Sequence, residues 1–114
     1  DIYGLCHITG GGLIDNIPRI LPKNVKVLIK KSYLLQNEFK VIQDLANLSD
    51  HDMYKTFNCG IGMMIFVSKE HVDEIKSLFT FSNIDYNILG IVKNKLKGEN
   101  ENINFVDMLY EIEN

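Results

Sequence analysis

The amino-acid sequence predicts an α/β (α+β) fold in which helices pack against a mixed β-sheet. Segments with the apolar content of strands alternate with segments whose apolar residues recur at helical spacing, and this alternation is typical of a layered domain. The 114 residues are 46% hydrophobic and 24% charged, which suits one domain with a single core. The net charge of −3 provides no basic stripe, so a nucleic-acid partner is not expected.

The first predicted elements surround a cluster of three glycines at positions 10–12. Residues 2–8 are apolar enough for a strand that ends just before this cluster. Residues 13–21 are predicted to be helical, with their apolar side chains on one side. Because Pro18 would remove a hydrogen bond from a helix interior and clash with the preceding turn, we expect a break near residues 16–17. Pro18 is then expected to open a second turn.

The middle of the chain contains one further strand pattern and two helix patterns. Residues 25–29 alternate apolar and basic side chains before becoming apolar, which predicts a strand near the exposed part of the sheet. Residues 37–46 have the spacing of an amphipathic helix. Ser49, followed by Asp50 and Asp52, is expected to cap the next helix. The predicted buried positions are Phe39, Ile42, Leu45 and Ala46 on the first helix and Met53, Tyr54 and Phe57 on the second.

The second half of the sequence continues the alternation. Residues 60–67 contain no polar side chain, and this continuous apolarity predicts a central strand covered on both faces. Ser68 is expected to cap a helix over residues 69–79, whose buried stripe is Val72, Ile75, Leu78 and Phe79. Residues 86–92 are a further predicted strand, residues 93–104 a polar mobile loop, and residues 105–112 a terminal helix or strand.

The glycine cluster is also the strongest functional pattern in the sequence. Glycine adopts positive φ readily and lets another group approach the main chain closely. If Leu13 opens a helix, the N–H groups of the loop and the helix N-terminus point the same way, which suits an anion such as phosphate. The alternative from the residues alone is a tight strand-to-helix turn without a ligand.

Two blocks of the sequence carry a family resemblance. The first runs His7-Ile8-Thr9-Gly10-Gly11-Gly12-Leu13 and continues with Asn16-Ile17-Pro18-Arg19 and Leu21-Pro22. The second comprises Phe39, Ile42, Gln43, Asp52-Met53-Tyr54, Thr56-Phe57-Asn58 and Gly60-Ile61-Gly62-Met63. In this order the blocks resemble phosphoribosylformylglycinamidine cyclo-ligase, also called aminoimidazole ribonucleotide synthetase, over residues 4–92. Cys59 departs from the pattern, because the family usually has methionine there.

The resemblance implies the C-terminal domain of the aminoimidazole ribonucleotide synthetase-like superfamily, with a mixed sheet flanked by helices. Residues 1–92 would be the later part of that domain, and residues 93–114 a polar loop and C-terminal tail. Because the chain starts at Asp1, we expect a fragment whose N-terminal ATP-binding domain lies upstream. That absent domain is expected to bind ATP and Mg²⁺, so the fragment alone is expected to be inactive. The intact enzyme is expected to be a homodimer.

The implied reaction is an ATP-dependent ring closure in de novo purine biosynthesis. Formylglycinamidine ribonucleotide is converted to aminoimidazole ribonucleotide: phosphoryl transfer activates the formyl oxygen, and an amidine nitrogen then displaces phosphate. Such catalysis depends on positioning and charge neutralisation. Thr9, Gly10, Gly11 and Gly12 are expected to hold an anionic part of the substrate or the transferred phosphate.

Three side chains near these blocks have two interpretations each. His7 can hydrogen-bond phosphate or transfer a proton during ring closure, or it can bond a neighbouring carbonyl and fix the loop. Asn58 can contact the substrate through its amide, or it can end the preceding helix in a structural role. Arg19 can meet a phosphate or be a solvated helix residue. His7 is therefore the catalytic candidate, and Asn58 joins the loop residues as a substrate-binding candidate.

Other classes of site have no pattern in this sequence. There is no spacing typical of metal ligands and no Ser/His/Asp arrangement, and Cys6 and Cys59 are expected to be reduced thiols in the cytoplasm. The longest apolar run is too short to span a bilayer, so no membrane partner is expected. One alternative is a related superfamily member, namely formylglycinamidine ribonucleotide synthetase, thiamine-phosphate kinase or selenophosphate synthetase. The other is a non-catalytic module that binds phosphate or a nucleotide.

Overall fold

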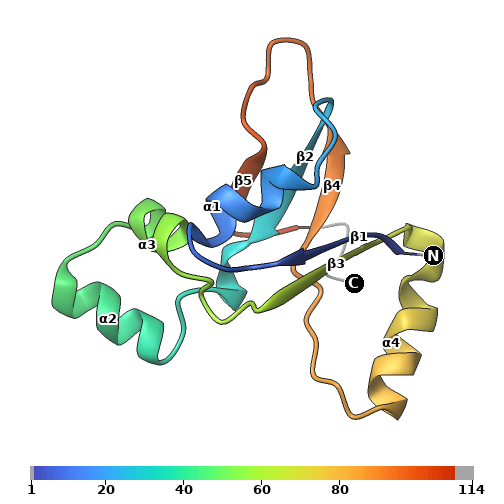
Figure 1. Ribbon diagram of the computed structural model, residues 1–114, viewed down its shortest axis with the longest axis horizontal. Coiled ribbons are helices and arrows are strands. Elements are labelled where there is room, and N and C mark those ends of the chain that lie inside the picture. The colour runs from blue at the N-terminus through green and yellow to red at the C-terminus, as the bar shows by residue number, and fades with distance from the viewer. Residues whose placement is uncertain (1, 110–114) are drawn as a thin grey trace.

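The strands lie in two small sheets with helices around them, in a computed structural model that describes residues 2–109 (Figure 1). In the first sheet, β1 (Ile2–His7) pairs antiparallel with β3 (Met63–Val67). In the second, β2 (Val25–Lys30) lies between β4 (Gly90–Asn94), to which it is antiparallel, and β5 (Ile103–Val106), to which it is parallel. The predicted α/β fold with a mixed sheet is therefore confirmed.

The predicted break after the glycine cluster is confirmed. The helix α1 covers only Gly12–Asn16, and a 3₁₀ turn, η1 (Ile17–Arg19), follows directly with Pro18 in its first turn. Proline is tolerated there because the first N–H groups of a helix have no intrahelical partner. Leu13 and Ile17 are fully buried, so the broken helix presents one continuous apolar side to the core.

The strand β2 is central rather than near the exposed part of its sheet, so the predicted position was wrong. It has hydrogen-bonded neighbours on both sides, and Val27 and Ile29 are buried. The basic residues that suggested exposure find polar partners at the margin of the sheet. Lys26, for example, forms an ion pair with Glu99, which lies in the loop after β4. An alternating pattern thus marks a strand with one buried face and does not give its place in the sheet.

The strand β3 is not the predicted central strand either. Within the described part of the chain it pairs with β1 alone, and the side chain of Met63 is 54% exposed. Residues 60–62, which belong to the same apolar run, form a turn and a short loop before the strand. A short apolar run does not by itself distinguish a central strand from one with a single neighbour.

Three further α-helices agree with the predicted positions but differ in what they bury. These are α2 (Glu38–Ala46), α3 (Asp50–Thr56) and α4 (Val72–Phe81). Ser49 caps α3 as predicted, because its Oγ accepts a hydrogen bond from the N–H of Asp52 at 3.1 Å. Met53 and Tyr54 on α3 are buried, as expected.

The apolar stripes of α2 and α4 are less buried than predicted. On α2, Leu45 is 83% exposed and the only buried residue is Gln43. No residue of α4 is buried, and Ser68 precedes a short 3₁₀ turn, η3 (Lys69–His71), without a side-chain capping bond. Both helices lie at the margins of the fold (Figure 1), so their apolar sides meet few other elements.

The C-terminal elements are shifted from their predicted positions. β4 begins at Gly90 rather than at residue 86, and β5 continues the chain after a loop at residues 95–102. Gly90 passes so close to the backbone of Leu28 that a Cβ would overlap the Leu28 carbonyl oxygen. The predicted terminal element over residues 105–112 is a strand up to Val106, and residues 110–112 lie outside the described range.

The core lies where β1 and α1, the elements on either side of the glycine cluster, pack against β2 and α3. Its largest fully buried side chains are Leu13, Ile17, Ile29 and Met53. Tyr54 stacks on Phe105 with ring centroids 4.0 Å apart, which joins α3 to β5. A second 3₁₀ turn, η2 (Lys31–Tyr33), follows β2 and leads toward α2. The core therefore fixes the position of α1 and of the glycine cluster at its start.

Candidate functional site

The two sequence blocks that carry the family resemblance meet in space beside α1. The N–H of Ile8 donates to the carbonyl oxygen of Gly62 at 2.9 Å, which joins the end of β1 to the loop before β3. Gly12 touches the other block: a Cβ on it would lie 2.6 Å from the carbonyl oxygen of Phe57 and would overlap that of Tyr54. The two blocks therefore form one structural unit around the start of α1.

The three glycines have three different surroundings. Gly12, at φ +63°, needs both the left-handed conformation and the absence of a side chain, since backbone atoms of α3 lie against it. Gly11, at φ +94°, precedes α1, and a Cβ there would lie 2.6 Å from the Asp15 carboxylate. Gly10 is exposed, and a Cβ on it would meet nothing within 4 Å. The turn geometry accounts for Gly11 and Gly12, whereas packing does not account for Gly10.

Asn16 holds the glycine cluster from the inside, a role that the sequence analysis did not assign to it. Its side-chain Nδ2 donates to the carbonyl oxygens of Gly12 at 2.7 Å, Thr9 at 3.2 Å and Gly10 at 3.3 Å. Its Oδ1 accepts from the Thr9 hydroxyl and from Arg19 Nη1, both at 3.3 Å. Asn16 is 3% exposed, and a buried amide requires several hydrogen-bond partners, so its role became visible only with the structure.

The loop presents unpaired backbone donors at its exposed tip. The N–H of Gly12 donates to the Thr9 carbonyl at 3.1 Å and closes the turn. The N–H groups of Gly10 and Gly11 find no acceptor anywhere in residues 2–109. Thr9 and Gly10 are exposed, so this part of the loop is accessible from solvent.

His7 and Arg19 lie next to the loop. His7 is the last residue of β1, opposite Met63, and its exposed imidazole forms no hydrogen bond within the described part of the chain. Arg19 is exposed. Its guanidinium donates a hydrogen bond to Asn16, which in turn binds the loop, and it makes no direct hydrogen bond to the loop within the described residues. A histidine and an arginine thus adjoin the same strand-to-helix connection.

Asn58 is occupied by its own turn. Its Oδ1 accepts from the N–H of Gly60 and its carbonyl from that of Ile61, each at 2.9 Å. The two central residues of this turn have positive φ, +54° at Cys59 and +89° at Gly60, the pattern of a type I′ turn. The observed contacts of Asn58 are thus structural, and the amide makes no hydrogen bond to the glycine cluster.

Both cysteines are free, buried thiols beside the same unit. Cys6 Sγ donates to the Asn16 carbonyl at 3.4 Å, and Cys59 Sγ lies 3.7 Å from the carbonyl oxygen of Met53. Burial raises the pKa of Cys59 to about 11. Burial also raises the pKa of Cys6, against the opposing effect of the Arg19 charge. At neutral pH both are neutral thiols rather than reactive thiolates.

Other kinds of site find little support in residues 2–109. Among the described residues, no group of three or more His, Cys, Asp or Glu side chains lies close enough together to hold a metal ion. No helix in this range is long and apolar enough to cross a membrane.

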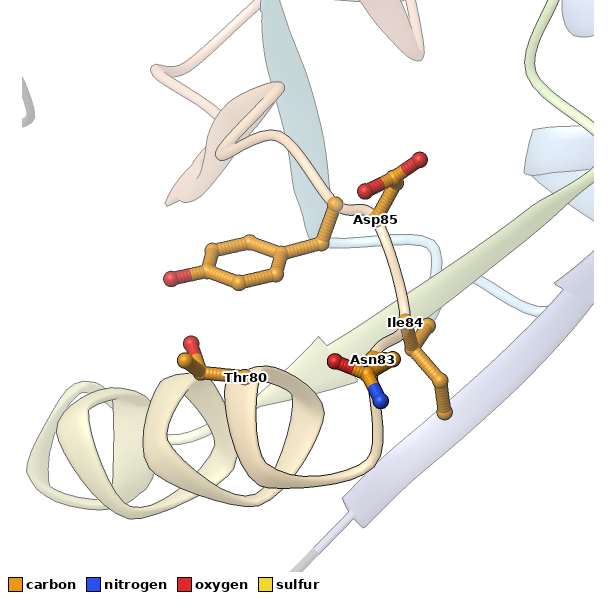
Figure 2. Close-up of a pocket in the computed structure, with 5 residues that line it drawn as sticks. Thr80, Asn83, Ile84 and Asp85 are labelled. Carbon is orange, nitrogen blue, oxygen red and sulfur yellow. The ribbon is translucent and has the colours of Figure 1, made fainter.

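An open pocket at the end of α4 is lined by Thr80, Asn83, Ile84, Asp85 and Tyr86 (Figure 2). None of the candidate site residues lines that pocket.

The chain belongs to a class of C-terminal domains, those of aminoimidazole ribonucleotide synthetase-like proteins. The family described as "AIR synthase related protein, C-terminal domain" matches residues 1–99, and the chain belongs to this family. The match extends through β4 and into the loop that follows it.

Curated relatives have one name in common. The chain is 48% identical over 75 residues to a protein of Geotalea daltonii, covering 65% of this chain and 22% of the relative. It is 38% identical over 101 residues to a protein of Neisseria gonorrhoeae, covering 88% of this chain and 29% of the relative. Both are named phosphoribosylformylglycinamidine cyclo-ligase, so the resemblance seen in the two blocks is confirmed. The chain spans between 22% and 29% of the length of these relatives.

Proposed function

We propose that this chain is the C-terminal part of an ATP-dependent phosphoribosylformylglycinamidine cyclo-ligase, and that its glycine cluster holds an anionic part of the substrate. One observation carries the proposal: Gly10 has no packing reason to be glycine, yet it lies at the exposed tip of the family's signature loop. Two unpaired N–H groups at that tip are donors of the kind that anionic oxygens accept.

The proposed roles follow from what each residue can do. The N–H groups of Gly10 and Gly11 bind the phosphate of formylglycinamidine ribonucleotide or the phosphoryl group in transit, while Gly12 fixes the turn. The Thr9 hydroxyl joins them by exchanging the hydrogen bond that it donates to Asn16 Oδ1 for one to the phosphate. His7, exposed and adjoining the loop, hydrogen-bonds that group or transfers a proton during ring closure. Asn58 supports this site through its turn, and its side-chain amide contacts the substrate.

The rest of the reaction is proposed to depend on parts of the protein beyond this chain. ATP and Mg²⁺ are bound mainly by an N-terminal domain, as the resemblance to the cyclo-ligases implies. The intact enzyme is proposed to be a cytoplasmic homodimer, and the C-terminal part alone to be inactive.

The direct test is phosphate release from ATP by the full-length protein, with and without formylglycinamidine ribonucleotide. Release that depends on the nucleotide, with aminoimidazole ribonucleotide forming in step, supports the cyclo-ligase. Absence of release from folded, full-length protein refutes it and favours a related kinase or a non-catalytic binding module.

A pair of variants tests the loop itself. Gly10→Val adds a branched side chain at the exposed tip, where nothing lies within 4 Å to be displaced, so activity should be lost while the folded state persists. Gly62→Val is the matched control, because its Cβ also meets nothing within 4 Å. Gly11 is a less suitable probe, since its positive φ and the Asp15 side chain make any substitution there strained. Equal activity of both variants would refute the assignment of the loop.

A further inference from the structure

Asn16 is a buried side chain that makes four of its five hydrogen bonds to Thr9, Gly10 and Gly12. It is 3% exposed, and its two amide hydrogens serve three carbonyl oxygens, those of Thr9, Gly10 and Gly12. Its Oδ1 accepts from Thr9 Oγ1 and Arg19 Nη1. No other described side chain donates a hydrogen bond to these three carbonyls.

The peptide geometry links this buried contact to the exposed donors. In a trans peptide the C=O of one residue and the N–H of the next point in opposite directions. Asn16 draws the carbonyls of Thr9 and Gly10 inward, so the N–H groups of Gly10 and Gly11 are turned away from it. The Thr9 carbonyl also accepts from the N–H of Gly12, whereas the Gly10 carbonyl has no donor other than Asn16 among the described residues. Glycine imposes little conformational preference of its own, so without Asn16 the Gly10–Gly11 peptide plane loses its anchor and the Thr9–Gly10 plane keeps one of its two.

We propose that Asn16 is a positioning residue: it orients the Gly10 and Gly11 N–H groups toward the substrate anion without touching the substrate. This inference rests on the proposed function of the loop and adds how the loop is kept ready to bind. A loop whose donors are fixed in advance loses less conformational entropy on binding, so removal of Asn16 should weaken binding at this loop and leave ATP binding unchanged.

A buried amide can also be needed only for stability, and Gln43 provides the matched control. It is 7% exposed, and its Nε2 donates to Asp50 Oδ1 at 2.7 Å, at the contact of α2 with α3. Gln43→Ala removes a buried amide as Asn16→Ala does, but it removes no hydrogen bond to residues 9–12, because the Gln43 amide donates to Asp50. An effect of destabilisation alone would therefore appear in both variants.

The test measures hydrogen exchange of the segment 9–13 in the full-length protein, titrated with formylglycinamidine ribonucleotide, together with KM for that nucleotide and for ATP. For Asn16→Ala we expect about a ten-fold rise in the nucleotide concentration that gives half-protection, and the same rise in its KM. KM for ATP should not change. Gln43→Ala should behave like the unaltered protein in both measurements.

Each other outcome is decisive. If Asn16→Ala is protected at the same nucleotide concentration as the unaltered protein, the positioning role is refuted while the proposed function stands. If the unaltered protein shows no protection at any concentration, the proposed function of the loop fails, and this inference fails with it. Should Asn16→Ala not fold, Asn16→Ser, which keeps one hydroxyl donor, replaces it in the same titration. Failure of both to fold would make Asn16 a residue of the fold alone and overturn the inference.

Discussion

Replacing Gly12 by alanine tests whether the two sequence blocks are packed as described. The substitution adds one methyl group where the chain enters α1. That methyl would lie 2.6 Å from the Phe57 carbonyl oxygen and overlap the Tyr54 carbonyl oxygen. Both are backbone atoms at the end of α3, so relief requires α1 and α3 to move apart.

The expected cost has two parts. Holding alanine in the left-handed conformation at φ +63° costs about 1–2 kcal/mol. Forcing an extra methyl into a packed site costs about 1–3 kcal/mol more. The sum, roughly 2–5 kcal/mol, is a large part of the net stability of a typical domain. For a domain of this size the melting temperature should fall by roughly 8–20 °C.

The assay is thermal and urea unfolding followed by circular dichroism, with Gly10→Ala as the control. Gly10 lies outside the positive-φ region and a Cβ there meets nothing, so its unfolding free energy should change by less than about 0.5 kcal/mol. A Gly12→Ala protein with the same melting temperature as the unaltered protein would refute the close contact of α1 with α3. Equal destabilisation by both variants would refute the distinction drawn between the two glycines.

Three further measurements test other parts of the fold. Gly90→Ala should lower the unfolding free energy in urea by at least about 1–3 kcal/mol, because its methyl would overlap the Leu28 carbonyl oxygen of the central strand. Ser49→Ala removes the cap of α3 and should cost about 1 kcal/mol in the same assay. Between pH 9 and about 11 the unfolded chain releases the Cys59 proton that the folded chain keeps, so stability should fall as pH rises through this window. Cys59→Ala should flatten that part of the profile, and a profile as steep as that of the unaltered protein would refute burial as its cause.

The elements near the N-terminus were predictable because glycine and proline act locally. Pro18 cannot lie inside a helix, so the break between α1 and η1 follows from covalent geometry alone. The helix cap at Ser49 was predictable for the same reason, because a hydroxyl before two acidic residues caps a helix whatever surrounds it. Such residues determine local structure without reference to the rest of the fold.

The positions of strands within sheets were not predictable for the opposite reason. β2 and β3 were assigned as strands correctly, but their places in the sheets depend on which distant segments pair with them. β2 became central because β5, more than seventy residues later, pairs parallel to it. The exposure of Leu45 on α2 likewise depends on tertiary packing, which an amphipathic pattern does not specify.

Within the candidate site, the sequence identified the loop but not what holds it. His7, Thr9 and the three glycines lie together, as contiguous residues must, and their surroundings came only from the structure. Asn16 escaped assignment because an asparagine in a short helix usually suggests a cap or an exposed side chain. Its role depends on burial, which the core residues Leu13 and Ile17 beside it determine.

The three glycines of the signature bear differently on function. Any protein with this strand-to-helix turn packed on α3 would need glycine at positions 11 and 12, whatever reaction it served. A relative that has the same residues at those positions, and at the turn around Asn58, therefore shares the fold, but this agreement does not identify the reaction. Gly10 is different, because neither its conformation nor its neighbours require glycine, and His7 is different because its exposed ring forms no hydrogen bond in the described chain. Chemistry specific to the proposed reaction must therefore be sought at these two residues, where packing leaves the choice of side chain open.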